Sequence, residues 1–291
     1  DPVKARATTA RELLDLGAKK IDTQMKDAPA AKLGVVNLFG DLYADLGLRS
    51  DEIRLRREAV DLTRALYGPD APELAAALGA LGGAMYGTEV ANEREPLLRE
   101  ALAILDRNGD RNSEIRGRLL LRFYELYDGR FETLPKALDY ARQSVQVLET
   151  HPPSVDLAEA WYTRGLAETY NFMPEQAIVS LNRAIEISGA VQGVPNAKLI
   201  VMYYELADTQ VDLQDFAAAE RSARRGLEMA LQVNGEDHVD AVRAHMMLGI
   251  ALLSGGHSAE GLEHLGRAKR DVLRLVGPDD PFHTRAVLEN H

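Results

Sequence analysis

A period of 42 residues runs through the second half of the chain. Residues 161–184 read as two short amphipathic helices joined by a tight turn, and the same pattern returns one and two periods later. The aligned positions are one bulky and three small residues per repeat: Trp161, Gly165, Ala177 and Ala184; Tyr203, Ala207, Ala219 and Gly226; His245, Gly249, Gly261 and Ala268. A unit of this size cannot bury its apolar face alone, so neighbouring repeats must stack.

The small residues predict close helix packing within each repeat. Gly165 in the first helix and Ala177 in the second would let the two backbones approach, while bulky residues fill the space to either side. The third repeat is degenerate, because Phe123 stands where a glycine is expected and Pro135 enters the second helix.

The junctions between repeats carry their own signals. In residues 67–72, Gly68 can take the left-handed conformation that ends a helix, Asp70 can cap the next helix, and Pro72 is tolerated in a first turn. Similar junctions follow at intervals of 41 or 42 residues. The period therefore extends over nearly the whole chain.

This spacing of one aromatic and three small residues resembles the tetratricopeptide repeat, and most closely the 42-residue variety of kinesin light chains. The resemblance implies an all-α fold: a right-handed superhelical solenoid of about six helix pairs plus an N-terminal capping helix. We expect a single domain over residues 1–291. Its predicted parts are a cap at 9–27, repeats at about 29–68, 70–109, 112–151, 154–192, 194–234 and 236–277, and a C-terminal stub at 281–291.

Composition excludes several classes of function. Hydrophobic residues make up 46% of the chain, but no apolar run approaches the roughly 20 residues that cross a bilayer. A net charge of −11 argues against a nucleic-acid binder, which needs clustered Lys and Arg. The absence of cysteine excludes disulfides, thiolate catalysis and Cys-ligated zinc without identifying a compartment. A start at Asp1-Pro2, without a signal-peptide pattern, favours a fragment or a processed product.

No motif in the sequence predicts catalysis, a cofactor or a metal. Residues 106–117 resemble a calcium loop, but Arg111 replaces its glycine and Gly117 its final glutamate, so we predict an inter-repeat turn. Histidines occur seven apart, at 238 and 245 and again at 257 and 264, but no carboxylate completes either pair in the pattern of a zinc-binding helix. We therefore interpret them as core or surface residues, and the chain as non-enzymatic.

The resemblance also implies a binding groove. In the family, positions beside the small residue of each first helix face a concave surface that holds a partner peptide, and tyrosine is a frequent hot-spot residue. For any one tyrosine, packing between repeats is the alternative. The predicted groove residues are Tyr86, Tyr124, Tyr127, Tyr162, Thr169, Tyr204, Asp208, Asp212 and Met246, within a wider row that adds Asn37, Asp41, Asp45, Asp128, Leu166, Arg243 and Ile250.

Carboxylates in this row predict a groove of negative potential and a neutral or basic ligand. The lysine and asparagine clamp with which the family grips acidic C-termini is not reproduced, because Asn37 is not accompanied by a lysine. The predicted partner is a protein or peptide, with no nucleic acid and no membrane insertion, and a homodimer is left open.

A narrower resemblance concerns residues 9–72. They are similar to the start of the repeat region that follows the kinase domain and membrane helix in bacterial Hanks-type serine/threonine kinases. This implies a periplasmic or extracytoplasmic sensor region. Similar arrays follow winged-helix regulators, so a cytoplasmic scaffold or regulatory arm of a transcription regulator is the alternative, and an unrecognised enzyme is the third.

Overall fold

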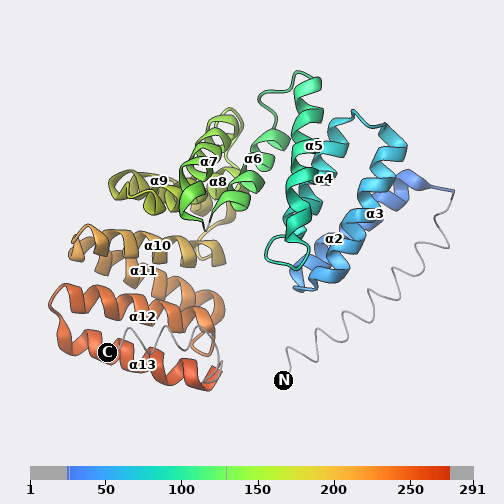
Figure 1. The fold of residues 1–291 in the computed structure, drawn as a ribbon. Coiled ribbons are helices and arrows are strands. Elements are labelled where there is room, and N and C mark those ends of the chain that lie inside the picture. The colour runs from blue at the N-terminus through green and yellow to red at the C-terminus, as the bar shows by residue number, and fades with distance from the viewer. Residues whose placement is uncertain (1–24, 26, 129, 276–291) are drawn as a thin grey trace. The chain divides into compact units, whose positions relative to one another are not determined.

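The computed structural model describes residues 25, 27–128 and 130–275, which form helices joined by short turns (Figure 1). This part of the chain contains twelve α-helices and no strand. The helices follow one another as the six pairs that the sequence predicts. The pairs are α2 (Pro29–Asp45) and α3 (Arg49–Tyr67), α4 (Pro72–Ala84) and α5 (Arg94–Arg107), α6 (Glu114–Tyr127) and α7 (Leu134–Leu148), α8 (Val155–Tyr170) and α9 (Pro174–Gln192), α10 (Ala197–Asp212) and α11 (Phe216–Asn234), α12 (Val239–Ser254) and α13 (Ser258–Leu275). Short 3-10 turns, η1 (Ala91–Glu93) and η2 (Phe131–Thr133), precede α5 and α7. The all-α prediction is confirmed.

The chain divides into two compact units, residues 1–127 and 128–291. The division falls inside the degenerate third repeat, between α6 and α7. We describe each unit separately, and a single domain over the whole chain stays a prediction. The predicted cap at 9–27, apart from residues 25 and 27, and the stub at 281–291 lie outside the described residues.

Helix pairs of unit 2 come close where the small residues stand. A Cβ atom on Gly165 of α8 would lie 2.8 Å from Cδ2 of Leu181 in α9. On Gly249 of α12 it would lie 2.6 Å from Cγ of Leu265 and 3.0 Å from the carbonyl oxygen of Gly261, both in α13. These contacts are too short for any side chain, so the glycines set the approach of the two helices, as the repeat pattern predicts.

The core of unit 2 continues from one pair to the next. One buried cluster combines Ala184 of α9, Met202 of α10, Met229 of α11 and Ala244 of α12, and the partly buried Tyr162 of α8 packs against it. Since one cluster draws on three successive repeats, each repeat completes its core with its neighbours.

The junction between α3 and α4 is as predicted in two of three respects. Gly68 ends α3 with a φ of +90°, and Pro72 opens α4. The prediction that Asp70 caps α4 is wrong, because the residue before the helix is Ala71 and no side chain caps it. Asp70 instead accepts a hydrogen bond of 2.7 Å from Nε of Arg107, at the end of α5. Its carboxylate therefore joins the turn before α4 to the end of α5, within one repeat.

The segment that resembles a calcium loop is an inter-repeat turn. The Asp110 carboxylate accepts hydrogen bonds from the backbone N–H groups of Asn112 (3.1 Å) and Ser113 (2.9 Å), and Arg111 donates to Asp106 at 2.7 Å. Although partial burial alone would raise it, the pKa of Asp110 is lowered by these hydrogen bonds from Ser113 and Asn112 and by Arg116 nearby. Its ionised form thus stabilises the turn.

We predict that Gly249→Leu destabilises the protein by about 1 to 3 kcal/mol, because the new side chain overpacks the contact between α12 and α13. The matched control is Gly34→Leu, also in a helix, where a Cβ meets nothing within 4 Å. Urea unfolding of the two variants measures the difference. Equal stabilities would show that the close approach does not constrain the fold.

Candidate functional site

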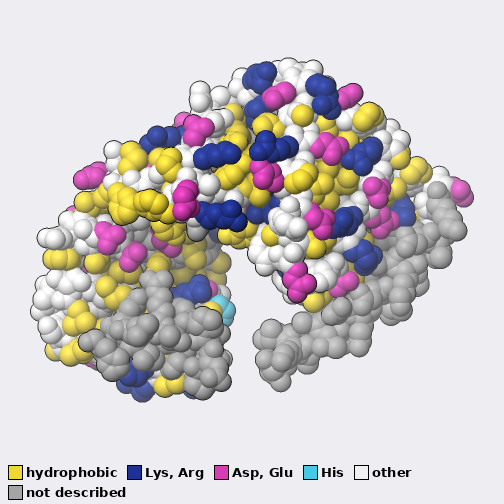
Figure 2. All heavy atoms as spheres, in the orientation of Figure 1, with side chains coloured by type: hydrophobic (Ala, Val, Ile, Leu, Met, Phe, Trp, Pro, Cys, Tyr) yellow, Lys and Arg dark blue, Asp and Glu magenta, His cyan; other side chains and the backbone are white. Residues whose placement is uncertain are grey.

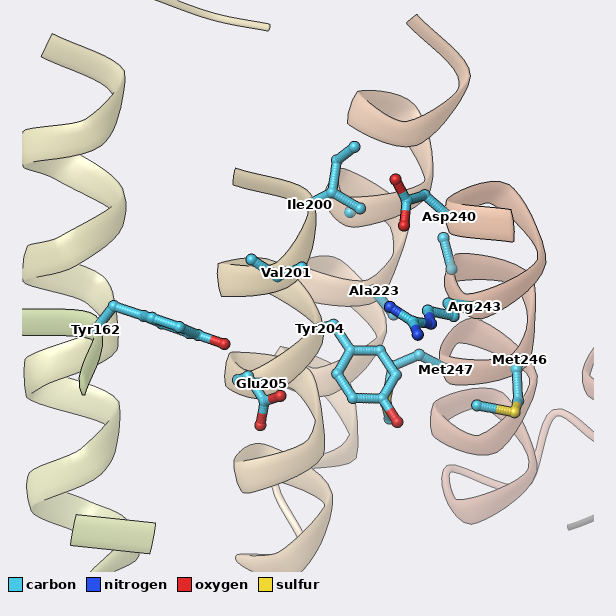
Figure 3. A pocket seen from close by; sticks show the side chains of 12 residues that line it. Tyr162, Ile200, Val201, Tyr204, Glu205, Ala223, Asp240, Arg243, Met246 and Met247 are labelled. Carbon is cyan, nitrogen blue, oxygen red and sulfur yellow. The ribbon is translucent and has the colours of Figure 1, made fainter. Parts of the chain in front are cut away.

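Unit 2 contains a pocket of about 320 Å³ between the first helices of successive repeats (Figure 3). It lies between α10 and α12, with α8 contributing from one side and α11 from behind. Its lining residues are Tyr162 from α8, Ile200, Val201, Tyr204 and Glu205 from α10, Ala223 and Gly226 from α11, and Asp240, Arg243, Ala244, Met246 and Met247 from α12. A pocket of this composition offers an apolar wall and a few polar groups, the usual make-up of a ligand site.

The two tyrosines reach the pocket from different helices. Tyr162 projects from α8 toward α10, with its hydroxyl group directed to the side where Tyr204 and Glu205 lie (Figure 3). Burial raises the pKa of the Tyr162 hydroxyl, and the nearby carboxylates of Glu205 and Glu159 raise it further. Tyr162 is therefore protonated at neutral pH and can donate a hydrogen bond.

The charged groups of the pocket are mixed but mainly acidic. Asp240 accepts a hydrogen bond of 2.8 Å from Nδ2 of Asn234, and its Oδ2 atom lies 3.3 Å from Nδ1 of His238. Glu205 adds a second carboxylate and Arg243 a guanidinium group. A ligand would meet apolar surface, two acidic groups and one basic group.

Four residues of the predicted row line this pocket: Tyr162, Tyr204 and Met246, and Arg243 from the wider row. Met246 is only 1% exposed and so forms part of the deep wall. Asp208 is half-buried and Asp212 exposed further along α10. Thr169 instead uses its hydroxyl group within the helices, donating to the carbonyl oxygen of Gly165 at 3.2 Å.

In unit 1 the three predicted tyrosines lie in different surroundings. Tyr86 is 48% exposed, with the Arg94 guanidinium 5.0 Å from the centre of its ring. Tyr127 donates a hydrogen bond of 3.0 Å to Glu95. Tyr124 is only 5% exposed, because α6 turns it into the helix packing, so little of its surface is left for a partner.

A different crevice of about 140 Å³ lies between α4 and α6. Arg118 and Arg122 line it, and neither was predicted from the sequence. Arg122 pairs with Glu125, and a 3.6 Å ion pair joins Arg118 to Glu114. The residues that line this crevice include two arginines and no carboxylate, so it lacks the acidic character of the pocket in unit 2.

Two of the four histidines considered in the sequence, His245 and His264, pair with each other across helices. Nδ1 of His245 on α12 lies 2.8 Å from Nδ1 of His264 on α13, and the two rings stack with centroids 5.0 Å apart. His238 accepts a hydrogen bond at the start of α12, and His257 lies 3.3 Å from Glu220. No group of three potential metal ligands occurs within residues 25–275 as far as the structure describes them.

Within the same part of the chain, no helix has an apolar stretch long enough to cross a bilayer.

No family model matches the sequence, and no curated protein sequence does. Solved structures are similar in fold. BtubC from P. vanneervenii is 18% identical with a TM-score of 0.67, over 80% of this chain and 94% of that one. A Rap protein in complex with Competence and Sporulation Factor is 12% identical with a TM-score of 0.60, over 91% of this chain and 70% of that one.

A third similar structure is the Pyrococcus horikoshii STAND signal-transduction ATPase with a tetratricopeptide repeat sensor. It is 15% identical with a TM-score of 0.62, over 98% of this chain and 47% of that one. This chain thus spans about half the length of that ATPase. At these identities the likeness shows the fold, an array of tetratricopeptide-like helix pairs.

We predict that acid weakens the α12–α13 pair. Burial, with Arg267 and His264 nearby, lowers the pKa of His245 to about 4, and burial also lowers that of His264. Since the unfolded chain binds these protons at a pKa of about 6.5, stability is full above that pH and falls as the pH drops toward 4. The expected loss is on the order of 2 kcal/mol.

Urea unfolding at pH 7 and pH 5 measures this loss. His245→Phe, which places an aromatic ring where other repeats carry Trp161 and Tyr203, should flatten the pH dependence. An unchanged pH dependence in the variant would assign the effect to other groups.

Proposed function

We propose that this chain is a non-enzymatic module that binds a protein or peptide, and that the pocket between α10 and α12 is its main contact site. The observation that carries the proposal is the convergence of Tyr162 and Tyr204, from two successive first helices, on one pocket whose wall includes the buried Met246 of the third. A volume of about 320 Å³ is near the lower end for small-ligand sites, which run from roughly 300 to 1,000 Å³. It suits one or two side chains of an extended ligand.

The surroundings of the pocket favour a ligand with an apolar anchor and a basic neighbour. Tyr204, Met246 and Met247 supply apolar walls. Along α10, Glu205 is followed by Asp208 and Asp212, so carboxylates lie on the helix that forms one wall. Such a field attracts cations and speeds their approach at low ionic strength.

The similar structures support a binding role. The Rap protein was solved in complex with Competence and Sporulation Factor, and the repeat region of the STAND ATPase is described as a sensor. A binding role therefore accords with these two proteins.

For the host protein, we propose the extracytoplasmic sensor region of a bacterial serine/threonine kinase, on the resemblance of residues 9–72. The competing proposal is the cytoplasmic regulatory arm of a transcription regulator. The coding sequence upstream of Asp1 distinguishes them. A kinase domain followed by about 20 apolar residues supports the first proposal, and a DNA-binding domain supports the second.

We predict that Val201→Trp blocks binding, because the indole ring would fill the space that the pocket leaves open. Peptides selected from a random library against the wild-type chain serve as probes, with affinity measured by calorimetry. The expected loss is about 2 kcal/mol or more. Tyr67→Ala, which removes a half-exposed tyrosine from α3 in unit 1, is the matched control and should bind normally. Normal binding by Val201→Trp would exclude the pocket.

Asp208→Lys should slow association of a basic peptide, chiefly at low salt, because it reverses a charge beside the pocket. Stopped-flow measurements at about 20 and 500 mM salt check this, since a Debye length shrinks several-fold over that range. An on-rate unchanged at low salt would contradict electrostatic attraction by α10.

Substitution of the two pocket tyrosines tests the binding site less directly than Val201→Trp does. Tyr162 and Tyr204 both pack partly buried against core clusters. The sequence predicts that replacing them leaves the thermal midpoint nearly intact, but this packing means that alanine there removes core contacts as well.

A further inference from the structure

The outer face of α9 differs from that of the equivalent helix in the next repeat. Its exposed positions include Val179, Arg183, Glu186 and Ala190, which lie three or four residues apart and so share one side of the helix. Val179 is 66% exposed. One period later, α11 carries Arg221, Arg225, Glu228 and Gln232 at the same positions, so it keeps the two central charges and replaces both apolar ends.

A shallow groove adjoins this face. Its lining residues are Trp161 of α8 and Ile178, Val179, Asn182, Arg183 and Glu186 of α9. Figure 2 shows hydrophobic side chains gathered on the side of the molecule where α9 runs in Figure 1. Exposed apolar surface of this kind, bordered by charges, is typical of an interaction site.

The order of charges on α9 is self-complementary. Arg183 and Glu186 form an ion pair of 2.6 Å within the helix. If a second α9 lies antiparallel across a two-fold axis midway between them, Arg183 faces the Glu186 of the other copy and Glu186 faces its Arg183. The same axis sets the exposed Val179 against Ala190 of the other copy. Charges and apolar groups both match, as a two-fold contact requires.

We propose that α9 is a homodimer interface, in which the outer face of one copy packs antiparallel on that of a second copy. This interface is separate from the pocket, which is lined by α8, α10, α11 and α12. A contact centred on one helix per subunit falls toward the small end of specific interfaces, below about 1,200 Å², so the dimer is concentration-dependent. The pocket remains available in each subunit.

Charge reversal followed by mixing tests the proposal. Sedimentation velocity of the full chain over a range of concentrations measures association of the wild type, of Arg183→Glu and of Glu186→Arg. Each single variant places like charges opposite each other, so dimerisation should weaken at least tenfold. An equimolar mixture of the two variants restores opposite charges across the axis and should recover association to within about threefold. Mixing cannot restore the ion pair within either helix, so recovery reports on the contact between copies.

The matched control is Arg225→Glu, which breaks the equivalent ion pair between Arg225 and Glu228 on α11. It should dimerise like the wild type. The single tryptophan of the chain, Trp161, lines the groove, so its emission should shift to longer wavelength when the wild type is diluted. A monomeric wild type at all concentrations, a mixture no better than its components, or an equal effect of Arg225→Glu would each overturn the proposal.

Discussion

The close contact between the two helices of a pair sets the geometry of the rest of unit 2. Gly165 and Gly249 let the leucines Leu181 and Leu265 of the second helices lie directly on the first-helix backbones. Because interiors pack densely, this contact fixes the depth and rotation of α8 and α12 against their partner helices. Other residues of the first helices point away from this contact, and some of them line the pocket.

The candidate pocket follows from that arrangement. Tyr162 and Tyr204 come from neighbouring first helices and rest partly on the core, so their rings are held in place before any ligand arrives. Ligand binding would then order fewer side chains, which lowers its entropic cost. Each tyrosine thus packs against the core with one part of its ring and lines the pocket with another.

How far the fold follows from the sequence can be read from individual residues. The period of 42 predicts the six helix pairs, and Gly68 and Pro72 predict a junction, because these depend on local conformation and spacing. Asp70 and Tyr124 depend on tertiary contacts: the first meets Arg107 at the far end of its own repeat, and the second is turned into the helix packing. The repeat predicts only half of the pairing of His245 with His264. His264 occupies the position of Ser180 and Ser222, which donate hydrogen bonds to Glu168 and Gln210 on the facing helices. The equivalent of those two partners is Leu252, so the pattern does not single out His245.

The central claim is that ligands bind on the first helices of unit 2. Hydrogen–deuterium exchange of the full chain, with and without a peptide selected for tight binding, tests it most directly. Slower exchange in α10 and α12 and around Tyr162, with the outer face of α9 unchanged, is the predicted result. Protection confined to unit 1 or to α9 and α13, with α10 and α12 unaffected, would contradict it.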